Sequence, residues 1–317
     1  MIREGWTPAR VRARYNATDS IAVFDLEPIS EGPVADSPAG SHIDVRVGPE
    51  GIVRQYSLCA RDSLPGTHRI AVLRVDPSRG GSSAMHDLRV GDTVEVSKPR
   101  QNFGLAEVSR HILLAGGIGI TPLIAMAWSL DRSGGDYHLH YVARSRETAV
   151  FVPDLHDNPR ATLHFTGGDR ARRPDAVTLL GPPDPKAAVY VCGPESFTSQ
   201  MLAGAADLGW APSALHTERF GAAETKDPAQ LSFAVRLAST GAQYEVPPDR
   251  SILQVLRANR VRVDFSCEQG ICGECVVTAL AGTPDHRDDV LTDSEREGGA
   301  VAICVSRSQG PLLELEL

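Results

Sequence analysis

The alternation of apolar and polar residues divides the chain into successive regions of different character. In the first hundred residues, short alternating runs are separated by turn residues, which is typical of antiparallel strands. The runs stand at residues 11–15, 21–26, 42–47, 53–58, 69–75 and 93–96. Short strands at this spacing predict a small antiparallel β-barrel, which we assign to residues 1–102.

From about residue 103 the pattern changes to apolar strands that alternate with helices. Strands are expected at 111–115, 137–143, 161–165, 187–192 and 213–218, and helices at 122–131 and 195–208. This alternation predicts an α/β doubly wound parallel sheet over residues 103–222.

A small, polar stretch at residues 223–229 predicts a linker, and residues 230–317 predict a further domain. Two strands (231–238 and 242–246), a helix (251–259) and a last strand (312–317) are expected there, with a cysteine-rich loop after the helix. The chain is therefore expected to be a multidomain protein.

The cysteine loop is the most specific motif in the chain. Its spacing is C-x4-C-x2-C, and a fourth cysteine follows much later. The four are Cys267, Cys272, Cys275 and Cys304. This is the thiolate spacing of plant-type 2Fe-2S clusters, and Gly270 and Gly273 let the backbone curl around the inorganic sulfides. Zinc is the alternative for four cysteines, but zinc sites usually pair two Cys-x2-Cys units and only one is present. Residues 230–317 are therefore expected to form an α+β domain that holds a 2Fe-2S cluster.

Composition narrows the classes of function that fit. The 317 residues are 42% hydrophobic and 23% charged, as in ordinary globular proteins, and no apolar run is long enough to span a bilayer. The first residues lack the apolar core of a signal peptide, so a cytoplasmic location is expected. A net charge of −8 argues against a nucleic-acid partner. Residues 230–317 hold 13 acidic residues, eight arginines and no lysine, a net of −5. This acidity is either a solvated face or a docking surface for a basic redox partner.

A glycine turn between a predicted strand and a predicted helix indicates a nucleotide site. Residues 115–122 read Ala-Gly-Gly-Ile-Gly-Ile-Thr-Pro. Gly117 and Gly119 permit a tight turn and close approach of a pyrophosphate, although the third glycine of the usual motif is replaced by Pro122. Thr121 is predicted as the N-cap and Pro122 as the first helical residue, so that the helix N-terminus faces the phosphates.

A second strand end, Cys192-Gly193-Pro194, lies at the carboxyl edge of the same predicted sheet. Ligands bind at this edge in doubly wound folds. Cys192 is therefore a candidate site residue, and a buried small apolar residue is the alternative interpretation.

The end of a barrel strand offers side chains that suit a flavin. Arg54 can pair with a phosphate, Tyr56 presents an aromatic plane and Ser57 can hydrogen-bond a ring nitrogen or oxygen. Small residues at Gly81-Ser82-Ser83 open a predicted helical turn that suits a phosphate.

Taken together, these motifs and their order resemble the phthalate dioxygenase reductase family of the ferredoxin reductase superfamily. The resemblance implies three domains in this order: a flavin barrel, a nicotinamide domain and a C-terminal plant-type ferredoxin domain with a β-grasp fold. The resemblance implies FMN rather than FAD, NADH as the electron donor, and a terminal oxygenase as the acceptor.

The resemblance also implies roles for individual residues. By position, Arg54, Tyr56 and Ser57 would hold the flavin, and residues 81–83 would lie at its phosphate. Gly117, Gly119, Thr121 and Pro122 would cradle the pyridine nucleotide. Cys192, Gly193 and Pro194 would lie near the nicotinamide, and Phe220 resembles the aromatic residue that covers the flavin ring. NADPH stays open as the donor, because Arg144 or Arg146 could accept a 2′-phosphate.

The resulting prediction is an NAD(P)H-dependent oxidoreductase, the reductase component of an oxygenase system. It takes hydride from NADH onto FMN and passes single electrons through the 2Fe-2S cluster to a terminal, Rieske-type oxygenase. A haem monooxygenase is the alternative acceptor. A redox-sensing flavin and iron–sulfur protein, and a zinc-stabilised interaction module, are the alternatives from other classes. No general acid or base is assigned.

Overall fold

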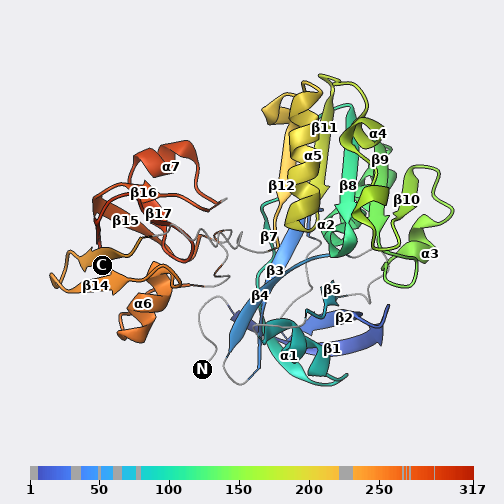
Figure 1. Cartoon of the computed structure of the whole chain (residues 1–317). Helices are drawn as coiled ribbons and strands as arrows, with labels where there is room; N and C mark the ends of the chain where they lie inside the picture. The colour runs from blue at the N-terminus through green and yellow to red at the C-terminus, as the bar shows by residue number, and fades with distance from the viewer. Residues whose placement is uncertain are drawn as a thin grey trace. The chain divides into compact units, whose positions relative to one another are not determined.

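The computed structural model describes residues 6–29, 37–48, 51–59, 66–75, 80–220, 231–265, 268, 270, 273–288 and 290–317. The chain divides into two compact units, Met1–Phe220 and Gly221–Leu317. Each unit has its own set of helices and strands (Figure 1) and its own apolar core.

The first half of unit 1 is an antiparallel sheet that curls on itself. Its strands are β1 (Trp6–Asn16), β2 (Ile21–Pro28), β3 (Ser41–Val47), β4 (Ile52–Ser57), β5 (His68–Leu73), β6 (Thr93–Ser97) and β7 (Arg100–Gln101), and helix α1 is Gly81–Asp87. The strand order is β4-β3-β6-β1-β2-β5, with β7 paired to β3. The two ends of this order, β4 and β5, lie against each other, so the sheet is nearly closed. The predicted antiparallel barrel is confirmed.

The second half of unit 1 is a parallel sheet with helices on both faces. Its strands are β8 (Arg110–Gly116), β9 (Asp136–Ala143), β10 (Ala161–Phe165), β11 (Ala187–Cys192) and β12 (Leu215–Glu218). Its helices are α2 (Ile120–Ser133), α3 (Val152–Leu155), α4 (Ala176–Leu180) and α5 (Glu195–Asp207). The order β10-β9-β8-β11-β12 reverses direction between β8 and β11, and every pairing is parallel. This is the predicted doubly wound sheet, whose ligand site lies where the order reverses.

One apolar cluster joins the barrel to the parallel sheet. Ile21 and Val23 of β2 and Phe103, which follows β7, belong to the same buried cluster as Leu113 of β8 and Leu123 of α2. On the opposite face of the sheet, α4 and α5 pack over a separate cluster. Because the barrel and sheet share a core, their sites are held in a defined relation within unit 1.

Unit 2 is a mixed sheet with one main helix across it. Its strands are β13 (Phe233–Leu237), β14 (Gln243–Val246), β15 (Val276–Ala281), β16 (Pro284–Asp285), β17 (Ala300–Ala302), β18 (Arg307–Ser308) and β19 (Leu312–Leu315). Its helices are α6 (Ile252–Ala258) and α7 (Asp293–Glu297). The order is β14-β13-β19-β15-β17, with β13 and β19 parallel and the other pairs antiparallel; β16 and β18 form a separate pair. The predicted α+β domain is confirmed.

The sequence analysis did not identify β15, β17 or α7 in this unit. The run Val276–Ala281 follows the cysteine motif directly, and its Val-Val-Thr-Ala-Leu-Ala pattern does not alternate. Its strand conformation comes from pairing with β17 and β19, which a local pattern does not report.

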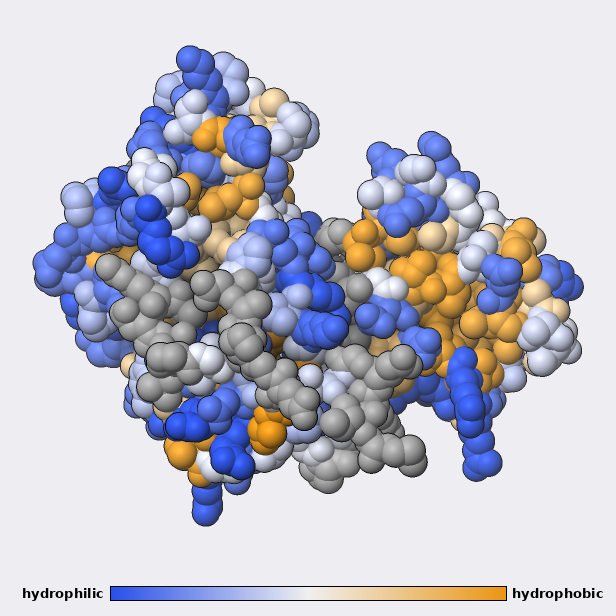
Figure 2. Space-filling view, turned by 180° about the vertical axis from the view of Figure 1, so that it is seen from behind, coloured by the Kyte–Doolittle hydropathy of each residue, from blue (hydrophilic) through white to orange (hydrophobic). Residues whose placement is uncertain are grey.

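The surface of unit 2 carries exposed apolar side chains. Figure 2 shows hydrophobic residues gathered on one face of this unit. Among its described residues, the most exposed large hydrophobic side chains are Leu231, Phe265 and Leu280.

In the described part of the chain, no helix is long and apolar enough to cross a membrane.

Candidate functional site

Two glycine turns touch at the carboxyl ends of β8 and β11. A Cβ atom placed on Gly119 would lie 2.3 Å from the Cys192 carbonyl oxygen, and one placed on Gly193 would lie 2.9 Å from the Gly116 Cα. Gly117 is glycine for a different reason: its φ is +55°, and a Cβ there would meet nothing within 4 Å. A tight turn beside open space is the arrangement that the predicted nucleotide cradle requires.

The prediction of Thr121 as the N-cap of α2 is wrong. A 3-10 turn at Gly117–Gly119 runs directly into the helix, which begins at Ile120 with Gly119 as its N-cap. The Thr121 hydroxyl donates a hydrogen bond to the Ile118 carbonyl at 3.1 Å, and Pro122 is the third helical residue. The helix starts early because Gly119 already has helical backbone angles, with φ −62° and ψ −3°. The positions of Thr121 and Pro122 in the first turn of α2 still place them beside the glycine turn.

The end of barrel strand β4 meets the carboxyl edge of the parallel sheet. The Ser57 hydroxyl donates to Glu218 Oε2 at 3.2 Å, although the two residues are 161 positions apart in the chain. Glu218 is the last residue of β12 and pairs in register with Cys192 of β11. Three side chains from both halves of unit 1 therefore gather beside the two glycine turns.

Burial controls the proton affinity of these groups. It raises the pKa of Glu218 to about 7, and the Ser57 hydrogen bond offsets only part of this effect. Burial, followed by the nearby Glu218 carboxyl, raises the pKa of Cys192 well above its ordinary value, so Cys192 stays a thiol. Glu218 is a candidate site residue that was not predicted from the sequence. Its position at the end of the strand expected at 213–218 was the available signal.

The flavin candidates lie together on β4 and the start of α1. A Cβ atom on Gly81 would lie 2.6 Å from Arg54 Cγ, so the first residue of α1 packs against the stem of Arg54. The Ser82 hydroxyl accepts a hydrogen bond from the Val75 N–H at 3.2 Å. Tyr56 precedes Ser57 on the same strand, and burial raises its pKa. The structure thus gathers an arginine, an aromatic ring and a close backbone approach along one strand.

Phe220 is 38% exposed and ends the described part of unit 1. Beside it, Arg219 Nε lies 3.8 Å from Glu195 Oε2 at the start of α5. That Phe220 covers the flavin ring stays a prediction.

In unit 2 the sheet brings the third and fourth cysteines together. The Ile303 N–H donates to the Cys275 carbonyl at 3.3 Å, directly after the β15–β17 pairing. Cys275 is 2% exposed and Cys304 is 7% exposed. Cys267 and Cys272 lie outside the described residues. Two buried cysteines at adjoining strand ends are what a cluster held by one loop and one distant segment requires.

The described glycines of the cysteine loop have left-handed backbone conformations. Gly270 and Gly273 have φ of +74° and +80°. A Cβ atom on Gly270 would also lie 2.6 Å from Val305 Cγ2. Gly270 therefore packs directly against the segment that carries Cys304, and the described residues fit an iron–sulfur cluster.

Comparison with known proteins identifies the family. A family model for the 2Fe-2S iron-sulfur cluster binding domain matches residues 235–309. The vanillate O-demethylase oxidoreductase of Pseudomonas sp. (strain HR199 / DSM 7063) is 43% identical over 287 residues, which are 88% of this chain and 90% of that protein. A solved structure of phthalate dioxygenase reductase, described as modular for electron transfer from pyridine nucleotides to [2Fe-2S], is 35% identical, with 99% of this chain and 98% of that chain covered and a TM-score of 0.76. The chain belongs to the phthalate dioxygenase reductase family.

As a phthalate dioxygenase reductase family member, the chain is an oxidoreductase with a 2Fe-2S domain. The choice of iron–sulfur over zinc is confirmed. The structure of an intact type IV self-sufficient cytochrome P450 monooxygenase is also similar, at 38% identity and a TM-score of 0.81, over 98% of this chain and 41% of that chain.

Proposed function

We propose that this phthalate dioxygenase reductase family member takes a hydride from NADH onto FMN and delivers single electrons through its 2Fe-2S cluster to a terminal oxygenase. One observation carries the first half of this proposal. The Ser57 hydroxyl, on the flavin strand, donates to Glu218, at the nucleotide edge of the sheet. Ligands held by these two elements would meet side by side, as hydride transfer requires.

Different candidate residues would hold different parts of FMN and of the dinucleotide. Arg54 and the Gly81-Ser82-Ser83 segment would bind the FMN phosphate, and Tyr56 and Ser57 would contact its ring. Gly117, Gly119, Thr121 and Pro122 would line the pyrophosphate of the dinucleotide. Cys192, Gly193 and Pro194 would border the nicotinamide, and Phe220 would cover the flavin ring. FMN supplies the chemistry of accepting two electrons and releasing them one at a time.

Glu218 would accept and release a proton where the flavin strand meets the nucleotide edge of the sheet. With a pKa of about 7, its carboxyl is divided between protonated and ionised forms at neutral pH. The Ser57 hydroxyl, on the flavin strand itself, donates to Glu218 Oε2, so it would link this carboxyl to the flavin ring. Cys192, which is 0% exposed and stays a thiol, would border the nicotinamide from within the core and bring no charge to it.

NADH is the proposed donor, and Arg144 and Arg146 are the residues that bear on this choice. Both are exposed and follow β9, at the carboxyl edge of the sheet. Arg146 lies 3.4 Å from the His156 ring and its guanidinium is 6.0 Å from the Phe165 ring. These contacts give Arg146 a role in the fold that needs no 2′-phosphate.

An anaerobic visible-spectrum titration tests the proposal. The purified brown protein is mixed with NADH and, separately, with NADPH. Rapid loss of flavin and cluster absorbance with NADH supports the donor, the flavin and the path between them. Rapid loss with NADPH alone would overturn the donor and assign Arg144 or Arg146 to a 2′-phosphate. Failure of both to reduce a protein that holds both cofactors would favour the redox-sensing alternative.

The proposed acceptor is a Rieske-type oxygenase, and a haem monooxygenase is the second candidate. The similarity to the vanillate O-demethylase oxidoreductase supports an oxygenase acceptor. The similarity to a self-sufficient cytochrome P450 supports the haem alternative. Mixing the reduced protein with a Rieske oxygenase or with a cytochrome P450 and following cluster reoxidation distinguishes the two.

A further inference from the structure

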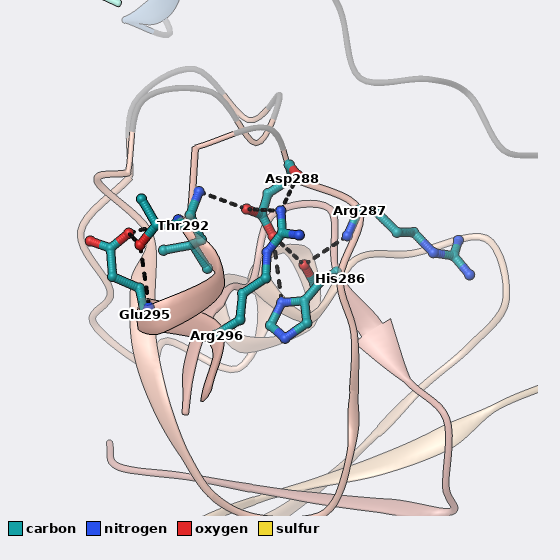
Figure 3. A network of polar contacts seen from close by, with 8 residues as sticks. His286, Arg287, Asp288, Thr292, Glu295 and Arg296 are labelled. Carbon is teal, nitrogen blue, oxygen red and sulfur yellow. Dashed lines mark hydrogen bonds and ion pairs between the residues drawn. The ribbon is translucent and has the colours of Figure 1, made fainter. Parts of the chain in front are cut away.

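Asp288, in unit 2, has a buried carboxylate at the centre of a polar network, and none of the roles proposed above uses this carboxylate. The Asp288 side chain is 0% exposed. Its Oδ2 accepts a hydrogen bond from the Leu291 N–H at 3.0 Å and lies 3.4 Å from an Arg296 nitrogen. Figure 3 shows the side chains of Arg296 and His286 directed toward Asp288. His286 Nδ1 is 3.6 Å from Asp288 Oδ1.

The network connects Asp288 to helix α7 through two kinds of contact. Arg296, in the last turn of α7, also donates to the Asp288 backbone carbonyl at 2.9 Å. The start of α7 is closed by a capping box, in which Thr292 and Glu295 bond each other's backbone N–H (Figure 3). The carboxylate and the main chain of Asp288 are therefore both held by one ordered helix.

On its other side, Asp288 touches the two segments that carry the cluster cysteines. The Ser306 hydroxyl, two residues after Cys304, donates to Asp288 Oδ1 at 3.4 Å. Gly270, in the cysteine loop, approaches so closely that a Cβ atom there would lie 3.1 Å from Asp288 Cα. The same Cβ atom would lie 2.6 Å from Val305 Cγ2. Asp288 therefore contacts Ser306, on the segment that carries Cys304, and lies beside Gly270 of the cysteine loop.

We propose that Asp288 is a positioning residue of the 2Fe-2S site, which fixes the Cys304 segment against the cysteine loop and whose charge lowers the reduction potential of the cluster. The inference rests on the 2Fe-2S domain and is independent of the proposed donor and acceptor.

Asp288 would act on the cluster both through geometry and through charge. A buried carboxylate is stable only with donors around it, and here a backbone N–H, a hydroxyl and a guanidinium contact it. Because these donors come from separate segments, the carboxylate holds them in one arrangement. A negative charge in a poorly screened interior also opposes the addition of an electron nearby. Hydrogen bonding and charge around a cluster are known determinants of its potential.

The test compares three variants as full-length protein with flavin and cluster. Asp288→Asn keeps the shape and removes the charge. Ser306→Ala keeps the charge and removes the link to the Cys304 segment. Asp285→Asn is the matched control, because Asp285 is an acidic residue on neighbouring β16 whose carboxylate pairs with Arg287 at 2.8 Å instead. The readouts are the potential of the cluster in a redox titration, the electron paramagnetic resonance spectrum of the reduced cluster, and the rate of cluster loss to a chelator.

Asp288→Asn should increase the reduced-to-oxidised ratio of the cluster at a fixed potential about tenfold, which corresponds to about 59 mV for one electron. Ser306→Ala should change the resonance spectrum and speed cluster loss, with a smaller change in potential. Asp285→Asn should match the wild type. The proposal is overturned if Asp288→Asn and Ser306→Ala both behave as the wild type, or if Asp285→Asn shifts the potential equally. It is also overturned if Asp288→Asn takes up no cluster while Ser306→Ala is unchanged, because the loss would then be a general folding defect.

Discussion

Replacing Gly119 with alanine should separate the two glycine turns at the nucleotide edge of the sheet. Gly119 has an ordinary helical φ of −62°, so alanine brings no backbone strain there. The added Cβ atom would, however, lie 2.3 Å from the Cys192 carbonyl oxygen, 2.4 Å from its carbon and 2.6 Å from the Gly193 nitrogen. All three are backbone atoms that cannot rotate away. Ordinary contacts begin at 3.4 Å, so one turn must move by about 1 Å.

A displacement of this size beside the reacting atoms is expected to slow hydride transfer by about 100-fold. Stopped-flow absorbance under anaerobic conditions, with NADH in excess, measures the rate of flavin reduction directly. The control is Gly134→Ala at the far end of α2, where φ is +71° and a Cβ atom would meet nothing within 4 Å. That variant should lose about 1 kcal/mol of stability and keep its rate of flavin reduction. The reasoning is refuted if Gly119→Ala reduces its flavin at the wild-type rate, or if Gly134→Ala is slowed as much.

The other predictions concern single buried or paired groups. Since burial raises the folded-state pKa of Glu218 to about 7 from 4.5, the wild type should lose stability as pH rises between these values. Glu218→Gln should remove this decline and stabilise unit 1 at pH 8 by about 3 kcal/mol, measured by thermal release of the flavin. Asp25→Asn should cost about 3–5 kcal/mol in urea unfolding, because Asp25 is 2% exposed and accepts two hydrogen bonds from Arg69 at 2.7 and 2.8 Å. Arg257→Gln should speed cluster loss to a chelator, because Arg257 donates to Glu268, the residue after Cys267, at 3.0 Å.

Each of these expectations has a result that would contradict it. For Glu218, the same pH dependence in the wild type and the variant would mean that the carboxyl is not buried as described. For Asp25, a change below about 1 kcal/mol would show that the pair with Arg69 contributes no more than a surface pair. For Arg257, an unchanged rate of cluster loss would show that the hydrogen bond to Glu268 does not order the loop.

Several features of this protein could be predicted from its sequence, because the signals for them lie in neighbouring residues. The Cys267–Cys275 spacing predicts an iron–sulfur loop from neighbouring residues alone, since one short loop supplies three ligands. Gly117 could be assigned to a tight turn because glycine's conformational freedom is an intrinsic property. Short runs of alternating apolar and polar residues predicted the barrel, and the alternation of strands with helices predicted the parallel sheet, since side-chain periodicity follows secondary structure.

The tertiary structure decided what depends on residues far apart in the chain. The only sequence signal for Glu218 was its position at a strand end, and its raised pKa exists because folding buries it beside Ser57, 161 residues away. Asp288 is one of many acidic residues in its region, and only folding places it between Gly270 and Ser306. Proton affinity and charge effects depend on burial and on neighbours, and these are fixed by long-range packing rather than by the local pattern. The sequence therefore determined which cofactors to expect, and the fold determined which buried carboxylates lie beside their candidate sites.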